Sequence, residues 1–188
     1  MHSLITSKTP DGYSLTLTTR LGKMLNRAQA DYGPRDESYT ILGIEFENNA
    51  PQIWYPGNCK HIAIQLTPDT ITNQIQGCYQ LAHECIHLLS PSGGYPTNIL
   101  EEGLATYFAH QYVEKEFDFP MPAAIPIAYE TARQLVHKLL EFDANAVKKI
   151  RKSQFAISKI TSENILEVVP QFNPADAQVL EQDFVPSL

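Results

Sequence analysis

The sequence predicts an α+β fold, because patterns typical of strands come first and patterns typical of helices follow. Up to residue 66, short runs rich in apolar and β-branched residues alternate with segments that contain glycine, proline and asparagine. From residue 67 onward, apolar residues recur at three- and four-residue steps, the spacing of a helix face. We therefore expect a small, mostly antiparallel N-terminal sheet followed by a helical C-terminal half, rather than a doubly wound sheet.

The length of 188 residues fits a single domain, since folding at this size buries roughly 70% of the surface that the unfolded chain exposes. We expect one domain over residues 1–188, with a strand-rich part at 1–66, a helix pair at 67–112 and a helical part at 113–188. A hydrophobic content of 43% with 19% charged residues is that of an ordinary globular protein.

Four strands are expected in the first third of the chain, at residues 13–19, 39–47, 52–55 and 61–66. In the first of them, Leu15 and Leu17 alternate with hydroxyl side chains, which is typical of a half-buried strand. The Pro-Gly-Asn sequence at 56–58 predicts a turn between the last two strands. A short helix is expected at 21–29.

The helical part is expected to begin at Thr67 as the cap and Pro68 in the first turn. From there a stripe packs one helix against the sheet; its members are Ile71, Ile75, Cys78, Ala82, Ile86 and Leu89. Further helices are expected at 127–142, at 146–150, from Thr161 or Ser162 through 169, and from Asn173-Pro174 through about residue 183.

His83 and His87 lie four residues apart inside the first of these helices, so both imidazoles share one face and can reach one metal ion. Glu84 is rotated by about 100° from His83. It therefore points beside the metal, where a carboxylate can take a proton from a metal-bound water. This H-E-x-x-H arrangement is that of zinc hydrolases.

A third ligand is needed, because catalytic zinc usually takes three protein ligands and leaves one position to water. After a turn at residues 91–94, Asn98 is expected as the N-cap of a new helix. Glu101 then completes a capping box by reaching back to the Asn98 amide. Glu102, one step around the helix, is left free to face the histidines as the third ligand.

Together these residues carry a family resemblance. His83-Glu84-x-x-His87, followed by the segment LEEGLATYF at 100–108, resembles the active-site helix pair of the gluzincin metallopeptidases. The second half is similar to the E-G-[FL]-A-[ST]-Y segment of the aminopeptidase N group. The resemblance covers 28 of 188 residues, and the fourteen residues between His87 and Glu102 suit a compact, minimal member.

The resemblance implies a zincin-like fold with one Zn²⁺ per chain, bound by His83, His87 and Glu102, and with Glu84 as the general base. It also implies that a strand near 61–66 borders the cleft and pairs with an extended peptide. The alternative for this segment is an interior strand. Cys78 and Cys85 are expected to be small core residues, because two histidines, one glutamate and water already fill the zinc shell.

Gluzincins usually hold the developing oxyanion with a tyrosine or histidine downstream of the glutamate ligand. The candidates are Tyr107, His110, Tyr112, Tyr129 and His137. Tyr129 is preferred as the second catalytic residue because it begins a helix behind the proline-rich segment 118–126, which we expect to line the cleft. Thr106, one turn after Glu102, is a candidate to orient that ligand.

The function expected from these residues is that of a zinc metallopeptidase acting on a peptide or protein. We favour an endopeptidase, because the sequence lacks the Gly-rich segment with amine-binding acidic residues that aminopeptidases carry upstream of the zinc helix. Two alternatives stay open. One is a catalytically inactive zincin scaffold that binds metal and serves as a partner-binding or regulatory module, and the other is a zinc enzyme that hydrolyses a non-peptide amide.

Charge and hydropathy argue against two other classes of partner. A net charge of −7 and a pI near 5.3 disfavour nucleic-acid binding, which needs a basic surface. The one dense basic run, at 148–152, is interpreted as a solvated helix end. No window is apolar for the eighteen or more residues that a membrane span requires, so no membrane partner is expected.

A cytoplasmic location is expected from the N-terminus and the cysteines. The first twenty residues lack the apolar core and cleavage pattern of a secretory signal. Cys59, Cys78 and Cys85 are odd in number and lack C-x-x-C spacing, which suits free thiols in a reducing compartment. A protein exported by a signal-independent route would share these features.

Overall fold

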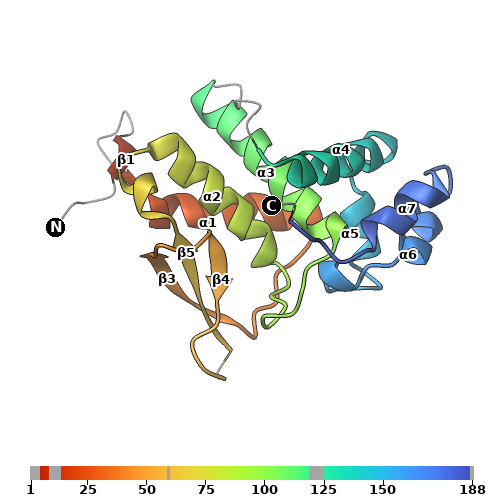
Figure 1. Cartoon of the computed structure of the whole chain (residues 1–188), viewed down its shortest axis with the longest axis horizontal. Helices are drawn as coiled ribbons and strands as arrows, with labels where there is room; N and C mark the ends of the chain where they lie inside the picture. The colour runs from red at the N-terminus through yellow and green to blue at the C-terminus, as the bar shows by residue number, and fades with distance from the viewer. Residues whose placement is uncertain (1–4, 9–13, 59, 119–124, 187–188) are drawn as a thin grey trace.

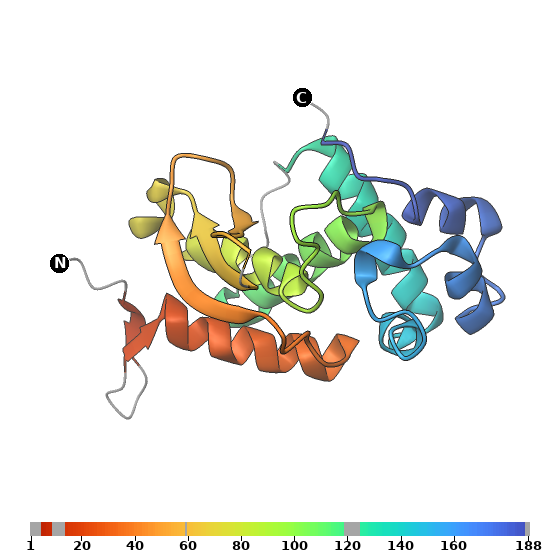
Figure 2. The same cartoon turned by 90° about the horizontal axis from the view of Figure 1, so that it is seen from below.

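The computed structural model describes residues 5–8, 14–58, 60–118 and 125–186 and has the predicted α+β architecture. A small sheet lies at one end of the molecule. Helices α5 (Ala146–Ile150), α6 (Ser162–Val168) and α7 (Pro174–Leu180) gather at the other end (Figure 1, Figure 2). Helices α2 (Gln74–His87) and α3 (Ile99–Phe117) connect the two ends, and α4 (Ile127–Phe142) packs on α3.

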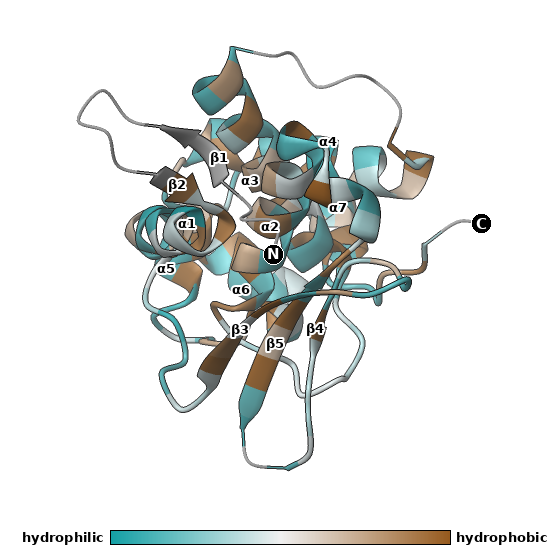
Figure 3. Cartoon of the chain, turned by 90° about the vertical axis from the view of Figure 1, so that its left-hand side faces the viewer, coloured by the Kyte–Doolittle hydropathy of each residue, from teal (hydrophilic) through white to brown (hydrophobic). Residues whose placement is uncertain are grey.

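The sheet has the strand order β3-β5-β4, with β5 (His61–Leu66) between β3 (Thr40–Phe46) and β4 (Gln52–Trp54). β4 runs antiparallel to β5 but β3 runs parallel to it, so the sheet is mixed and not mostly antiparallel as predicted. Burial explains the order: β5 is buried from its second residue onward and takes the centre, where both of its edges pair. Figure 3 shows the hydrophobic residues along β3 and β5.

The position of β5 confirms the interior-strand interpretation of residues 61–66. β4 instead lies at an edge of this sheet, because it pairs with β5 alone among the described strands. The strands predicted at 39–47 and 52–55 are confirmed within one or two residues, and residues 57–58 form the predicted turn.

The N-terminal strand prediction was wrong at its end. Strand β1 (Ile5–Lys8) pairs antiparallel with β2 (Ser14–Thr16), and helix α1 (Leu17–Tyr32) follows β2 directly. Residues 17–19 are therefore helical, and the helix predicted at 21–29 is longer at both ends. The cause is a capping box: the Thr16 hydroxyl accepts from the Thr19 amide, and the Thr19 hydroxyl accepts from the Thr16 amide. Leu17 therefore faces the core from a helix and not from a strand.

The metal-motif helix begins later than predicted. Thr67 and Pro68 start a short 3-10 helix, η1 (Pro68–Ile71), and α2 begins only at Gln74, with Asn73 as its cap. Ile71 consequently leaves the predicted stripe and is 42% exposed. The later members of the stripe are fully buried, as predicted; they are Cys78, Ala82, Ile86 and Leu89.

The helical half agrees closely with the sequence. α4 and α5 have the predicted bounds, and Thr161 caps α6 and Asn173 caps α7, although α7 ends at Leu180. Of the proline-rich segment expected to line the cleft, residues 119–124 lie outside the described residues. Among the described helices, none has both the length and the apolarity needed to cross a bilayer. Cys78 and Cys85 are buried free thiols, and Cys59 lies outside the described residues.

The basic run at 148–152 is not wholly a solvated helix end. Lys149 and Lys152 are exposed, but Arg151 is 4% exposed and its guanidinium donates to carbonyl oxygens of residues 32–34 and of Leu89. These bonds tie the end of α1 to the turn that follows α2. Arg151 thus pairs with carbonyl groups at the end of α1 and in the segments that follow α1 and α2.

Two glycine substitutions test the packing of the helices against each other. A Cβ on Gly103 in α3 would lie 2.4 Å from the backbone oxygen of Ala132 in α4, so Gly103→Ala should lower the free energy of unfolding by about 2 kcal/mol or more. Gly22 in α1 has open space around its Cα, and Gly22→Ala should raise that free energy by about 0.5–1 kcal/mol. Urea unfolding measures both, and effects of the same sign would contradict this packing.

Candidate metal centre

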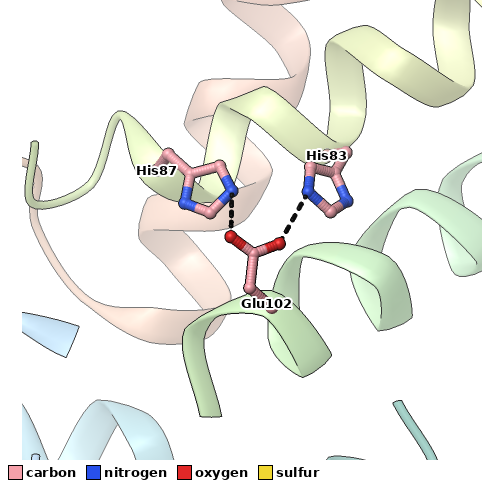
Figure 4. A group of neighbouring side chains, drawn as sticks. All are labelled: His83, His87 and Glu102. Carbon is pink, nitrogen blue, oxygen red and sulfur yellow. Dashed lines mark ion pairs between the residues drawn. The ribbon is translucent and has the colours of Figure 1, made fainter. Parts of the chain in front are cut away.

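The predicted metal ligands come together where α2 ends and α3 begins. Figure 4 shows His83 and His87 on α2 with their rings directed at the carboxylate of Glu102 on α3. His83 Nε2 lies 3.2 Å from Glu102 Oε2, and His87 Nε2 lies 3.6 Å from Glu102 Oε1. Each side chain offers one ligand atom, and these atoms lie within 4.8 Å of one another. The cluster could therefore hold a metal ion.

The kinds of donor in this cluster suit a zinc ion. The distances of 3.2 and 3.6 Å run to two different oxygens of Glu102, so they show that both imidazoles face one carboxylate. Two imidazole nitrogens and one carboxylate oxygen are a donor set that zinc accepts, with a fourth position left for water.

Glu101 supports the cluster in a way that the sequence did not reveal. Its Oε1 accepts a hydrogen bond of 2.9 Å from His87 Nδ1. With its proton held on Nδ1, the imidazole presents Nε2 to Glu102 and to a metal. The capping box predicted for Glu101 was therefore wrong about the side chain, although Asn98 does cap α3 by accepting from the Glu101 amide at 2.9 Å.

A second supporting residue, Thr97, was also missed. The Thr97 hydroxyl donates to Glu102 Oε1 at 2.7 Å and so fixes the carboxylate's rotation. Thr106, predicted to orient a ligand, does not reach the carboxylate: its hydroxyl donates to the main-chain oxygen of Glu102 at 2.8 Å. Thr97 precedes the helix cap and carries no sequence signal that distinguishes it from other threonines.

The charges of the cluster are strongly coupled. Burial alone would lower the pKa of His87, but Glu102 and Glu101 outweigh burial and raise it to about 10. Burial alone would raise the pKa of Glu102, but the two imidazoles lower it to about 2. At neutral pH a protonated His87 therefore balances part of the negative charge, and a divalent cation can replace that proton.

Glu84, the residue predicted as general base, is buried beside the cluster. It is 3% exposed, and it lines the same cleft as the two histidines and Glu102. Burial raises its pKa, and the histidines oppose this effect. A carboxylate with a raised pKa is a stronger proton acceptor than an exposed one.

A cleft of about 220 Å³ opens over the cluster. Residues of β4 and the residue after it line one part of the cleft; they are Gln52, Ile53 and Tyr55. Residues of the turn between α2 and α3 line another part; they are Ser92, Gly94, Tyr95 and Thr97. The metal ligands form the floor. The side chains of His83, His87 and Glu102 are 11–14% exposed.

A second cleft of about 280 Å³ adjoins the first and shares Pro51, His83, Glu84 and Tyr129 with it. Its lining also includes residues of α2 and residues just before α4; these are Gln76, Tyr79, Gln80, Ile125 and Pro126. The two clefts therefore adjoin beside His83 and Glu84, and we call them together the groove.

Tyr129 is the one candidate for oxyanion binding that lines the groove. Its ring lies 6.0 Å from the His83 ring, centroid to centroid, and packs at 4.7 Å on Phe184. Burial, followed by the charges of Glu102 and Glu84, raises the pKa of Tyr129 to about 12. The hydroxyl therefore keeps its proton at neutral pH and can act as a donor.

The other four candidates have different environments. Tyr107 and His137 stack on each other beside a separate cavity. The Tyr112 hydroxyl accepts from Arg20 at 3.0 Å, and His110 packs against the ring of Tyr79. Of the five candidates, Tyr129, which the sequence favoured, is thus the one that lines these clefts.

The contact between Glu101 and His87 predicts that Glu101→Gln weakens zinc binding by about 10- to 100-fold. The amide can donate as well as accept, so it no longer holds the proton on Nδ1. Competition with a chelator measures the affinity. Glu114→Gln, an exposed change on the same helix, is the matched control, and equal affinities for the two variants would contradict the role of Glu101.

The raised pKa of His87 predicts that zinc binding depends on pH. Because His87 is protonated below about pH 10, each zinc bound at pH 8 should release about one proton. The proton competes with the metal, so zinc affinity should fall about tenfold per unit as pH is lowered from 8 to 7. Calorimetry in buffers of different ionisation enthalpy counts the protons; a count of zero would contradict the raised pKa of His87.

Comparison with protein-family models, with curated proteins and with solved structures finds no match to this chain. The resemblance to gluzincins therefore rests on the residues of the two site helices. What the geometry adds is a cluster of His83, His87 and Glu102 that could hold a metal ion, placed on the floor of a groove.

Proposed function

We propose that this protein is a zinc-dependent endopeptidase in which His83, His87 and Glu102 bind the metal. One observation carries the proposal: the ligand cluster lies where the two clefts of the groove adjoin, with Glu84 and Tyr129 lining both clefts. A groove of two adjoining clefts accommodates a chain that extends on both sides of the reacting position. This shape favours an endopeptidase over an exopeptidase.

Each residue has a role that follows from its environment. Zinc bound at the cluster would polarise the scissile carbonyl and lower the pKa of a bound water toward about 7. Glu84 accepts the proton of the attacking water and returns it to the leaving amine. Tyr129, protonated at neutral pH, donates a hydrogen bond to the oxygen on which negative charge develops. Glu101 and Thr97 hold His87 and Glu102 in place.

The position of β4 at an edge of the sheet supports a peptide as the substrate. Gln52 and Ile53 of this strand line the groove, and β4 pairs with β5 alone among the described strands. An extended peptide can add to such an edge through main-chain hydrogen bonds, which are independent of its sequence. A strand-like substrate would then lie across the ligand cluster.

Substitution of the general base tests the mechanism. Glu84→Gln should keep about one zinc per chain by elemental analysis, while kcat/KM on an unfolded protein substrate falls by about 10²- to 10⁴-fold. His83→Ala and Glu102→Ala should lose both zinc and activity, and Glu114→Gln should keep both. Undiminished turnover in Glu84→Gln would refute the mechanism. Stoichiometric zinc without any hydrolysis by the unmodified protein would instead favour a non-hydrolytic, partner-binding role.

A further inference from the structure

We propose that residues 182–184 are a positioning element of the metal site, which holds Glu102 through Thr97 and holds Tyr129 through Phe184. The part concerning Tyr129 rests on the proposed hydrolytic function, whereas the part concerning Glu102 requires only that the cluster binds metal. The segment lies far from both residues in sequence and contributes no ligand.

Backbone hydrogen bonds join this segment to the start of α3. The Ile99 amide donates to the Gln182 carbonyl at 2.9 Å, and the Phe184 amide donates to the Thr97 carbonyl at 2.9 Å. The two bonds flank an antiparallel bridge between Asn98 and Asp183. Because Asn98 is the N-cap of α3, the segment fixes the chain immediately before the first helical turn, which carries Glu102.

Thr97 transmits this constraint to the ligand. Its carbonyl accepts from Phe184, and its hydroxyl donates to Glu102 Oε1 at 2.7 Å. Displacement of the Thr97 backbone would therefore move the donor that sets the rotation of the carboxylate. Partners of this kind commonly change metal affinity when they are removed, although they never touch the metal.

Phe184 contacts Tyr129, which lines the groove. Its ring packs at 4.7 Å on Tyr129, whose own ring lies 6.0 Å from that of His83. Gln182 and Asp183 are exposed, and Val185 is 76% exposed, so Phe184 is the residue at 182–185 that packs most of its side chain against the protein. Phe184, the packed side chain of this segment, is thus also the side chain that contacts the groove residue Tyr129.

Two substitutions at one position separate the two effects. Phe184→Ala removes the ring but keeps the amide that donates to Thr97, whereas Phe184→Pro removes both. Val185→Ala and Val185→Pro are the matched controls at the neighbouring exposed position. Zinc affinity is measured by chelator competition, which requires no hydrolysis, and kcat and KM are measured on a peptide that the unmodified protein cleaves.

Zinc affinity should fall by about tenfold in Phe184→Pro and in Thr97→Val, and it should stay within about threefold of the unmodified protein in Phe184→Ala, in Thr97→Ser and in both Val185 variants. Phe184→Ala should lower kcat by about tenfold with little change in KM. In a Tyr129→Phe background, the same change should lower kcat by less than about twofold, because residues that act through one another are not additive.

Unchanged zinc affinity in Phe184→Pro and Thr97→Val would overturn the proposal for Glu102, and fully additive losses of kcat would overturn it for Tyr129. If Phe184→Pro does not fold, Thr97→Val with its rescue by Thr97→Ser decides the first point. If the unmodified protein binds zinc but hydrolyses no peptide, the proposed function fails, and zinc affinity alone then decides whether residues 182–184 position the metal site.

Discussion

The structure is organised around the burial of three glutamates at one point. Glu84, Glu101 and Glu102 are 3%, 1% and 8% exposed, and they meet where α2 ends and α3 begins. Buried carboxylates are costly unless cations and hydrogen-bond donors compensate them. Two histidines supply part of the compensation, and the neighbouring glutamates raise the pKa of His87 despite its burial, which favours its positively charged form. A divalent cation meets that demand more completely than one proton, so the fold and the metal-binding chemistry depend on the same interaction.

Two of these three carboxylates lie at a helix N-terminus, where the backbone stabilises negative charge. Glu101 and Glu102 lie in the first turn of α3, where unpaired amides and the helix dipole favour negative charge. Asn98 caps this turn and also donates to carbonyls at 157 and 160, which anchors the turn to the helical end of the molecule. Next to Glu102, Gly103 lets α4 approach α3 so closely that no Cβ fits between them. That approach brings Tyr129, at the start of α4, across the groove from the ligands.

Local signals predicted most of the helices and the identities of the clustered residues. The bounds of α4 and α5 and the caps Thr161, Asn173 and Asn98 follow from patterns within a few residues. The failures share a different cause, competition between partners. Thr16 could continue a strand or cap a helix, and Glu101 could complete a capping box or bind His87. β3 and β4 could pair with each other, but the more apolar β5 separates them. Such alternatives are resolved only by contacts between residues far apart in the sequence. For the same reason the sequence did not predict the contact of Thr97 with Glu102 or that of Phe184 with Tyr129.

Glu84 is the residue that bears on whether the cluster is structural or catalytic. A structural zinc site usually fills all four positions with protein ligands, whereas the described residues offer three that meet, and Glu84 is not among them. If the cluster served only stability, an apolar residue at position 84 would avoid the cost of burying a carboxylate beside two others. Its burial raises its pKa, and it lines both clefts of the groove. Such a carboxylate costs stability, and that cost is understandable if the group moves a proton during catalysis.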